Sequence, residues 1–264
     1  MKSITVAGET IVYNELGAGP PLVFISGLGG VAAEWLEDMK HFATSRRCLT
    51  LEHPGLGGTP QPRTPCGAPQ MADRIAAGLV ALGVDSATVL GMSMGGAVAQ
   101  ELALRHPNLV ERLVLTGSFA KLDTRAERAI TTLVKLMGTG DLKLAVRMFY
   151  WLGFGAEFYE RNLSALDAAV DEYVADPIDH GVFEYQLEAC LAHDTRGRLA
   201  GITCPALVVH GTADLLVRPY LARELADALP NASLVLMEGS GHSCNWEQPA
   251  LFRREVDAFI TRTE

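Results

Sequence analysis

The sequence of 264 residues has no apolar run that approaches the twenty or so residues needed to cross a bilayer. Residues 1–6 alternate in polarity and lack the long apolar stretch of a signal peptide. The five cysteines are an odd number without paired spacing, so we expect free thiols in a reducing compartment. These absences predict a cytoplasmic protein without a membrane partner.

Positive charge and metal ligands are also scarce. Lys and Arg number 22 against 31 Asp and Glu, and the net charge of −9 argues against a nucleic-acid partner. The seven histidines are scattered, and none has a second ligand at helical spacing, so we expect neither a metal ion nor another cofactor. Hydrophobic content of 48% with 20% charged residues is typical of a globular enzyme.

Short apolar runs alternate with helical patterns in the first and last parts of the chain. Strands are expected at 3–15 (two strands with a turn at 7–9), 22–25, 47–51, 86–90, 109–116, 204–209 and 233–237. Helices are expected at 32–42, 71–83, 97–105, 218–229 and 249–262. Alternation in units of about thirty residues predicts an α/β fold with right-handed crossovers and a mostly parallel sheet flanked by helices.

The alternation stops in the middle of the chain, where no strand pattern is found from about residue 119 to 200. Helical patterns cover 125–137, 142–151, 157–175 and 182–193 instead. We interpret residues 119–202 as a helical insertion that forms a cap, or lid, over a core made of residues 1–118 and 203–264. Because a lid and a dimer interface have the same apolar pattern, the sequence leaves a homodimer open.

A Gly-x-Ser-x-Gly pentapeptide, Gly91 to Gly95, lies between the strand expected at 86–90 and a helix. A sharp strand-to-helix turn forces its central serine, Ser93, into unfavourable backbone angles, so both flanking positions must lack bulk. The serine hydroxyl then stands clear of the sheet. This context predicts a nucleophile.

Four segments together resemble the α/β-hydrolase superfamily over roughly residues 1–118 and 203–264. Gly91–Gly95 resembles the nucleophile elbow, and Ser26–Gly30 matches the loop after the third strand, with Ser26 in place of the family's usual histidine. His210–Asp214 resembles the segment that carries the acid. Gly241–His242, followed by Glu247-Gln248-Pro249, resembles the loop of the catalytic histidine. The resemblance implies the α/β-hydrolase fold.

The resemblance also implies roles for particular residues. Ser93 would be the nucleophile, His242 its general base and acid, and Asp214 the acid that orients the imidazole. Some members place the acid after the preceding strand, which here points to Asp123. The backbone N–H groups of Leu28 and Met94 would form the oxyanion hole.

We expect a serine hydrolase that cleaves a small-molecule carboxylic ester or lactone through an acyl-enzyme. The apolar wall of its pocket is predicted to include Leu28 and Met94 together with the substrate-binding residues Trp35, Phe119, Met148, Tyr150, Trp151 and Val217. An arginine aimed at a carboxylate would indicate a small acidic lactone, and the candidates are Arg125, Arg147 and Arg218.

Other uses of the same triad remain open, because a fold does not fix a reaction. They are carbon–carbon bond hydrolysis, perhydrolysis, and acyl transfer or cyclisation. Carbon–carbon hydrolases of this type usually carry an asparagine before the elbow serine, where this chain has Met92. A hypothesis outside the enzymes is a member of the superfamily that binds a ligand without turnover. Members of that kind often lose a triad residue, whereas all three are present here.

Overall fold

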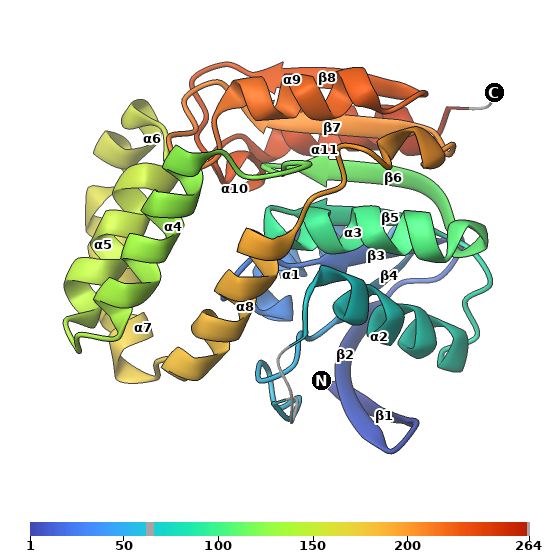
Figure 1. Cartoon of the computed structure of the whole chain (residues 1–264), viewed down its shortest axis with the longest axis horizontal. Coiled ribbons are helices and arrows are strands. Elements are labelled where there is room, and N and C mark those ends of the chain that lie inside the picture. The colour runs from blue at the N-terminus through green and yellow to red at the C-terminus, as the bar shows by residue number, and fades with distance from the viewer. Residues whose placement is uncertain (62–65, 263–264) are drawn as a thin grey trace.

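A single sheet of eight strands forms the centre of the computed structural model, which describes residues 1–61 and 66–262 (Figure 1). The strands are β1 (Lys2–Val6), β2 (Glu9–Leu16), β3 (Pro21–Ile25), β4 (Arg47–Leu51), β5 (Ala87–Met92), β6 (Val110–Thr116), β7 (Ala206–Gly211) and β8 (Ala232–Met237). Their order across the sheet is β1-β2-β4-β3-β5-β6-β7-β8. The strands from β4 to β8 in that order pair in parallel, and the two antiparallel pairs are β1 with β2 and β2 with β4. The predicted α/β fold class is therefore confirmed.

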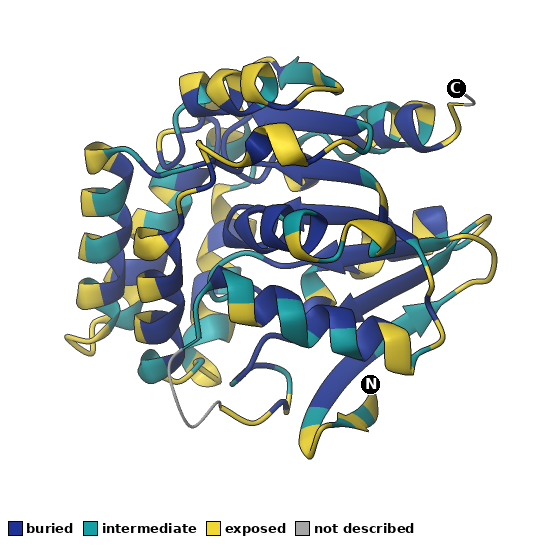
Figure 2. Ribbon diagram, turned by 45° about the vertical axis from the view of Figure 1, so that its right-hand side comes forward, coloured by how far each residue is buried: buried dark blue, intermediate teal, exposed yellow. Residues whose placement is uncertain are grey.

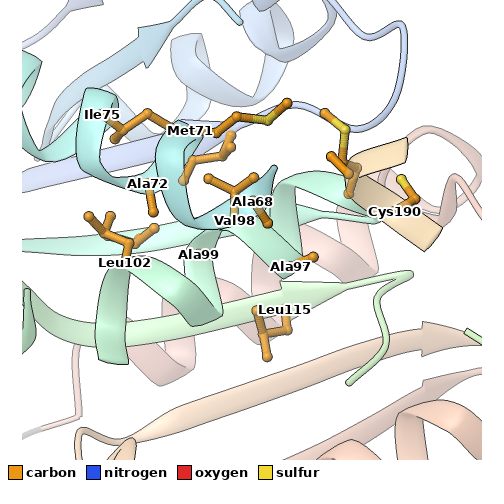
Figure 3. Packing of buried hydrophobic residues seen from close by; sticks show 14 of the residues in the cluster. Ala68, Met71, Ala72, Ile75, Ala97, Val98, Ala99, Leu102, Leu115 and Cys190 are labelled. Atoms are coloured by element: carbon orange, nitrogen blue, oxygen red, sulfur yellow. The ribbon is translucent and has the colours of Figure 1, made fainter. Parts of the chain in front are cut away.

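The central strands are apolar on both sides because helices cover both faces of the sheet. In β3, Val23 and Ile25 face one hydrophobic core, and Leu22 and Phe24 face the other. The first core packs against α2 (Ala68–Ala81), α3 (Met94–Arg105) and α9 (Pro219–Ala228). Figure 3 shows part of this packing, in which small side chains let α2 and α3 approach each other.

The second core packs against α1 (Leu36–Phe42) and α11 (Pro249–Ile260). Short helical turns complete the core: η1 (Ala32–Trp35), η2 (Pro107–Leu109), η3 (Leu199–Gly201) and α10 (Cys244–Glu247). The last of these turns carries no pattern long enough for the sequence to have predicted it. Figure 2 shows the buried residues gathered in the strands and on the helix faces turned toward them.

The helical insertion, residues 119–202, connects β6 to β7 and contains no strand. Its helices are α4 (Thr124–Met137), α5 (Leu142–Gly153), α6 (Ala156–Arg161), α7 (Leu163–Ala175) and α8 (His180–Ala192). They lie to one side of the sheet, next to the end at which β6 leads into α4 (Figure 1). The helix expected over 157–175 is in fact two helices, because the chain turns at Asn162, whose side-chain amide donates a hydrogen bond to the carbonyl of Phe158 at 2.8 Å.

Within the described residues, we find no helix with the length and apolar character of a membrane span. The five cysteines are free thiols, as predicted. Cys244, two residues from His242, is buried, and burial raises the pKa of its thiol to about 12.

Candidate active site

Ser93 occupies the turn between β5 and α3, with φ of 54° and ψ of −119°. These angles lie in a region that L-residues rarely adopt. The glycines on either side make the turn possible. A Cβ at Gly91 would collide with the carbonyl of Gly95, and a Cβ at Gly95 would collide with the carbonyl of Ile25. The strand-to-helix context predicted for the pentapeptide is therefore confirmed.

His242 and Asp214 form a buried pair. Nδ1 of His242 lies 2.7 Å from Oδ2 of Asp214, in loops that follow β8 and β7 respectively. Oδ1 of Asp214 accepts hydrogen bonds of 2.8 Å from the backbone N–H groups of Leu216 and Val217. Because Asp214 accepts at Nδ1, the hydrogen of a neutral imidazole is on that nitrogen and Nε2 is left free to accept a proton.

The electrostatics of Asp214 favour its ionised form. Burial by itself raises the pKa of the carboxyl. The positive charge of a protonated His242 and hydrogen bonds from His210 and His242 outweigh that effect and lower the pKa to about 2. Nε2 of His210 lies 3.2 Å from Oδ2 of Asp214 and 2.8 Å from the carbonyl oxygen of Val217. The carboxylate is thus charged at neutral pH and held on both oxygens.

Asp123, the alternative acid, is occupied elsewhere. Its Oδ1 accepts a hydrogen bond of 2.6 Å from the backbone N–H of Ala126 and caps the first turn of α4. Its other oxygen accepts from the hydroxyl of Tyr220. Of the two candidate acids, Asp214 is the one in contact with His242.

A cavity of about 170 Å³ lies between the end of the sheet and the helical insertion, and both Ser93 and His242 border it. Among the described residues, no hydrogen bond joins these two side chains. The described residues that line this cavity are Gly27, Leu28, Gly29, Gly30, Glu34, Met92, Ser93, Ile130, Leu133, Val134, Met137, Val146, Phe149, Tyr150, Tyr173, Phe183, Cys190, Leu216, His242, Ser243 and Trp246. The cavity is mostly apolar with a few polar groups, as small-molecule sites usually are.

The loop from Ser26 to Gly30 lies directly against the elbow. A Cβ at Gly27 would stand 3.3 Å from the Cβ of Ser93. In the described part of the chain, the backbone N–H groups of Leu28 and Met94 have no hydrogen-bond acceptor. Both groups therefore have a free donor near the serine, which is what an oxyanion hole requires.

Ser26, which stands where the family usually has a histidine, is tied into the core. Its Oγ accepts a hydrogen bond of 3.1 Å from Nε1 of Trp35. Its carbonyl oxygen lies 2.9 Å from Nε2 of the buried His53. Two side chains thus hold the start of the loop.

The cavity differs from the predicted substrate wall. Among the six predicted substrate-binding residues, Tyr150 lines it. Trp35 packs against Phe24 in the second core, and Phe119 packs against His193. The prediction for both is corrected: each is fully buried in protein and lies outside the lining.

The other three predictions also require correction. The side chain of Val217 is buried in the first core, and its contribution is the backbone N–H that holds Asp214. Met148 and Trp151 are exposed, with 37% and 55% of their surface accessible, whereas Val146, Phe149 and Tyr150 on the same helix line the cavity. Sequence alone did not reveal which face of α5 turns inward.

Two polar residues near the site were missed by the sequence analysis. Glu34 lines the cavity from η1, and Gln186 of α8 accepts a hydrogen bond of 2.7 Å from the N–H of Gly29. Neither belongs to a recognisable motif. The apolar residues of α4 that line the cavity repeat at helical spacing, and they are Ile130, Leu133, Val134 and Met137. Such a stripe is usual for any packed helix, so it does not by itself indicate a binding site.

Comparison with known proteins agrees with this architecture. Residues 20–249 match the family model described as "alpha/beta hydrolase fold". The chain therefore belongs to the α/β hydrolase fold family, a class of hydrolases.

Individual relatives span nearly the whole chain. A protein of Rhizobium rhizogenes (strain K84), named "Putative carbamate hydrolase RutD", is 30% identical over 90% of this chain and 92% of its own length. The enol-lactonase from Burkholderia xenovorans LB400 superposes with a TM-score of 0.87 at 28% identity, covering 99% of this chain and 100% of that one. MGS-M2, an α/β hydrolase from a Medee basin deep-sea metagenome library, superposes with a TM-score of 0.93 at 19% identity, covering 100% and 98%, which shows the shared fold.

Proposed function

We propose that this protein is a serine hydrolase that cleaves a carboxylic ester or lactone through an acyl-enzyme. The observation that carries the proposal is the 2.7 Å contact between His242 and Asp214 at the edge of the cavity that Ser93 also borders. A strained serine, a histidine with a free Nε2 and a buried carboxylate are the parts that this chemistry needs.

In the proposed mechanism, Oγ of Ser93 attacks the carbonyl carbon of the substrate while Nε2 of His242 takes the hydroxyl proton. The negative oxygen of the tetrahedral intermediate accepts hydrogen bonds from the N–H groups of Leu28 and Met94. His242 then gives its proton to the departing alcohol. A water molecule, deprotonated by His242, attacks the acyl-enzyme, and His242 gives that proton to Oγ of Ser93 as the bond to the acyl group breaks and the acid leaves.

The helical insertion would act as the cap that selects the substrate. Its helices α4, α5, α7 and α8 supply much of the cavity lining, and that lining is mostly apolar. Such a wall favours a substrate of modest size with apolar parts around the reacting carbonyl.

The charged side chains near the cavity limit the class of substrate further. None of the three candidate arginines lines it: Arg147 pairs with Asp167 at 3.1 Å on the surface, Arg125 is exposed, and Arg218 precedes α9. Among the described residues of the lining, a carboxylate in the cavity would find no lysine or arginine to pair with. We therefore favour neutral or cationic esters over small acidic lactones.

A carbamate is the second candidate substrate. The relative at 30% identity carries a carbamate hydrolase name, and a carbamate carbonyl can be attacked by the same serine. Carbon–carbon hydrolysis is less favoured, because the residue before the serine is Met92, which offers no side-chain amide donor.

A small fluorophosphonate tests the proposal, because it labels an activated serine without knowledge of the substrate. Intact mass should show one adduct on the wild type and none on Ser93→Ala. Ser243→Ala is the matched control, since Ser243 is a second serine on the same cavity, and it should still be labelled. A folded wild type without an adduct, or labelling that persists in Ser93→Ala, would contradict the proposed nucleophile.

A further inference from the structure

Among the described residues that line the cavity, Glu34 is the one carboxyl group, and none is a lysine or an arginine. It sits on η1, just after the loop that would form the oxyanion hole, and its backbone N–H bonds to the carbonyl of Val31 at 3.0 Å. The side chain approaches Gly30 so closely that a Cβ there would stand 2.6 Å from Oε2. The carboxyl therefore lies at the wall of the cavity, close to the loop beside Ser93.

This carboxyl has no cation to balance it. In the described part of the chain, no ion pair involves Glu34. Burial raises the pKa of Glu34 to about 8; a hydrogen bond from the N–H of Val31 opposes this effect and the nearby Glu52 adds to it. Burying a carboxyl that no cation of the described residues pairs with costs stability, so its position on the cavity favours a role toward a ligand.

Aromatic side chains supply the second observation. Five of them line the same cavity: Phe149, Tyr150, Tyr173, Phe183 and Trp246. The faces of aromatic rings attract cations, and a cluster of rings is the usual way in which proteins bind alkylated ammonium groups. Tyr150 is close enough to Glu34 for the carboxylate to raise the pKa of its hydroxyl, after the larger effect of burial.

We propose that Glu34 and these aromatic side chains form a subsite for a positively charged amine, so that the enzyme prefers esters that carry an ammonium group. This rests on the proposed hydrolase function. The bound cation lowers the pKa of the Glu34 carboxyl from its raised value, so the carboxylate form pairs with the positive charge while the rings surround the alkyl groups of the ammonium. The net charge of −9 also attracts a cation toward the protein.

Binding of phenyltrimethylammonium tests the subsite without any catalysis. Calorimetry should detect binding to the wild type and a loss of affinity of about tenfold or more in Glu34→Gln. Glu37→Gln is the matched control, because Glu37 is a nearby glutamate that is exposed and paired with Lys40. It should bind as the wild type does. No binding to the folded wild type, or equal binding to Glu34→Gln, would overturn the proposal.

Hydrolysis of three butyrate esters then tests the preference. Their alcohols are choline, its uncharged isostere 3,3-dimethylbutanol, and a similar alcohol ending in a carboxylate. The wild type should favour the choline ester over its isostere by about tenfold in kcat/KM, and Glu34→Gln should bring that ratio close to one. Equal rates for the two esters in the wild type would overturn the preference. Ammonium binding without hydrolysis of any ester would instead count against the proposed hydrolase function and leave the subsite supported.

Discussion

Oε1 of Gln186 accepts a hydrogen bond of 2.7 Å from the backbone N–H of Gly29, across 157 residues of sequence. Gln186 belongs to the helical insertion and is fully buried, whereas Gly29 lies in the loop next to Ser93. Phe183, one turn earlier on α8, packs against the same glycine, which has φ of 72°. The insertion thus fixes the backbone that carries the N–H of Leu28.

Replacing Gln186 by Met should slow the chemical step, because the loop loses the acceptor that orients it while the volume is nearly kept. We expect kcat to fall by about ten- to a hundredfold, less than the loss of a whole oxyanion donor, with KM little changed. The matched control is Glu188→Ala, an exposed position on the same helix. Steady-state kinetics with an ester substrate checks this, and a change in KM alone would contradict a role in positioning the loop.

The two candidate acids can be separated by paired substitutions. Asp214→Asn should lower kcat by about three to four orders of magnitude, because an amide cannot hold the imidazole with its hydrogen on Nδ1. Asp123→Asn should change kcat by less than about tenfold, since an asparagine still caps α4. A larger loss for Asp123→Asn would move the acid to that position.

The pKa of Glu34 predicts a dependence of stability on pH. Its pKa is about 8 in the folded protein and 4.5 ordinarily, so unfolding releases a proton between these values. The free energy of unfolding should therefore fall as the pH rises through this window and level off above about pH 8. Glu34→Gln removes this contribution.

Urea unfolding of both proteins between about pH 5 and pH 8 checks the sign. The wild type should lose stability more steeply than Glu34→Gln. Glu247, whose pKa burial also raises, contributes equally to both curves and cancels in the difference. Parallel curves would show that Glu34 ionises as readily in the folded protein as in the unfolded chain.

The elbow should tolerate no side chain at Gly91. Gly91→Ala places a Cβ against the carbonyl of Gly95, and relief requires a backbone shift, so we expect a loss of about 1–3 kcal/mol in the free energy of unfolding. Gly197→Ala is the control, because a Cβ there meets nothing within 4 Å and should change stability by less than about 0.5 kcal/mol. Chemical denaturation of the two variants measures both values.

Much of the fold could be predicted from the sequence because its signals are local. Apolar runs such as residues 22–25 identify buried strands, and glycines at 91 and 95 identify a turn that admits no side chain. The roles expected of Ser93, Asp214 and His242 rested instead on the resemblance to the α/β-hydrolase superfamily. The break between α6 and α7 at Asn162 and the short helix α10 were not predicted. A single hydrogen bond or a single helical turn leaves no repeating pattern of apolar residues in the sequence.

Local patterns predicted the strands, the helices that flank them and the elbow turn at Ser93, since each depends on residues close together in the chain, whereas the pairing of Asp214 with His242 was expected from the family resemblance. The lining of the cavity could be known only from the folded structure, in which Met148 and Trp151 face outward, Phe149 and Tyr150 face inward, and Glu34 lies on the wall. The physical reason is that the rotation of a helix about its axis is set by packing against distant segments, which no local pattern records.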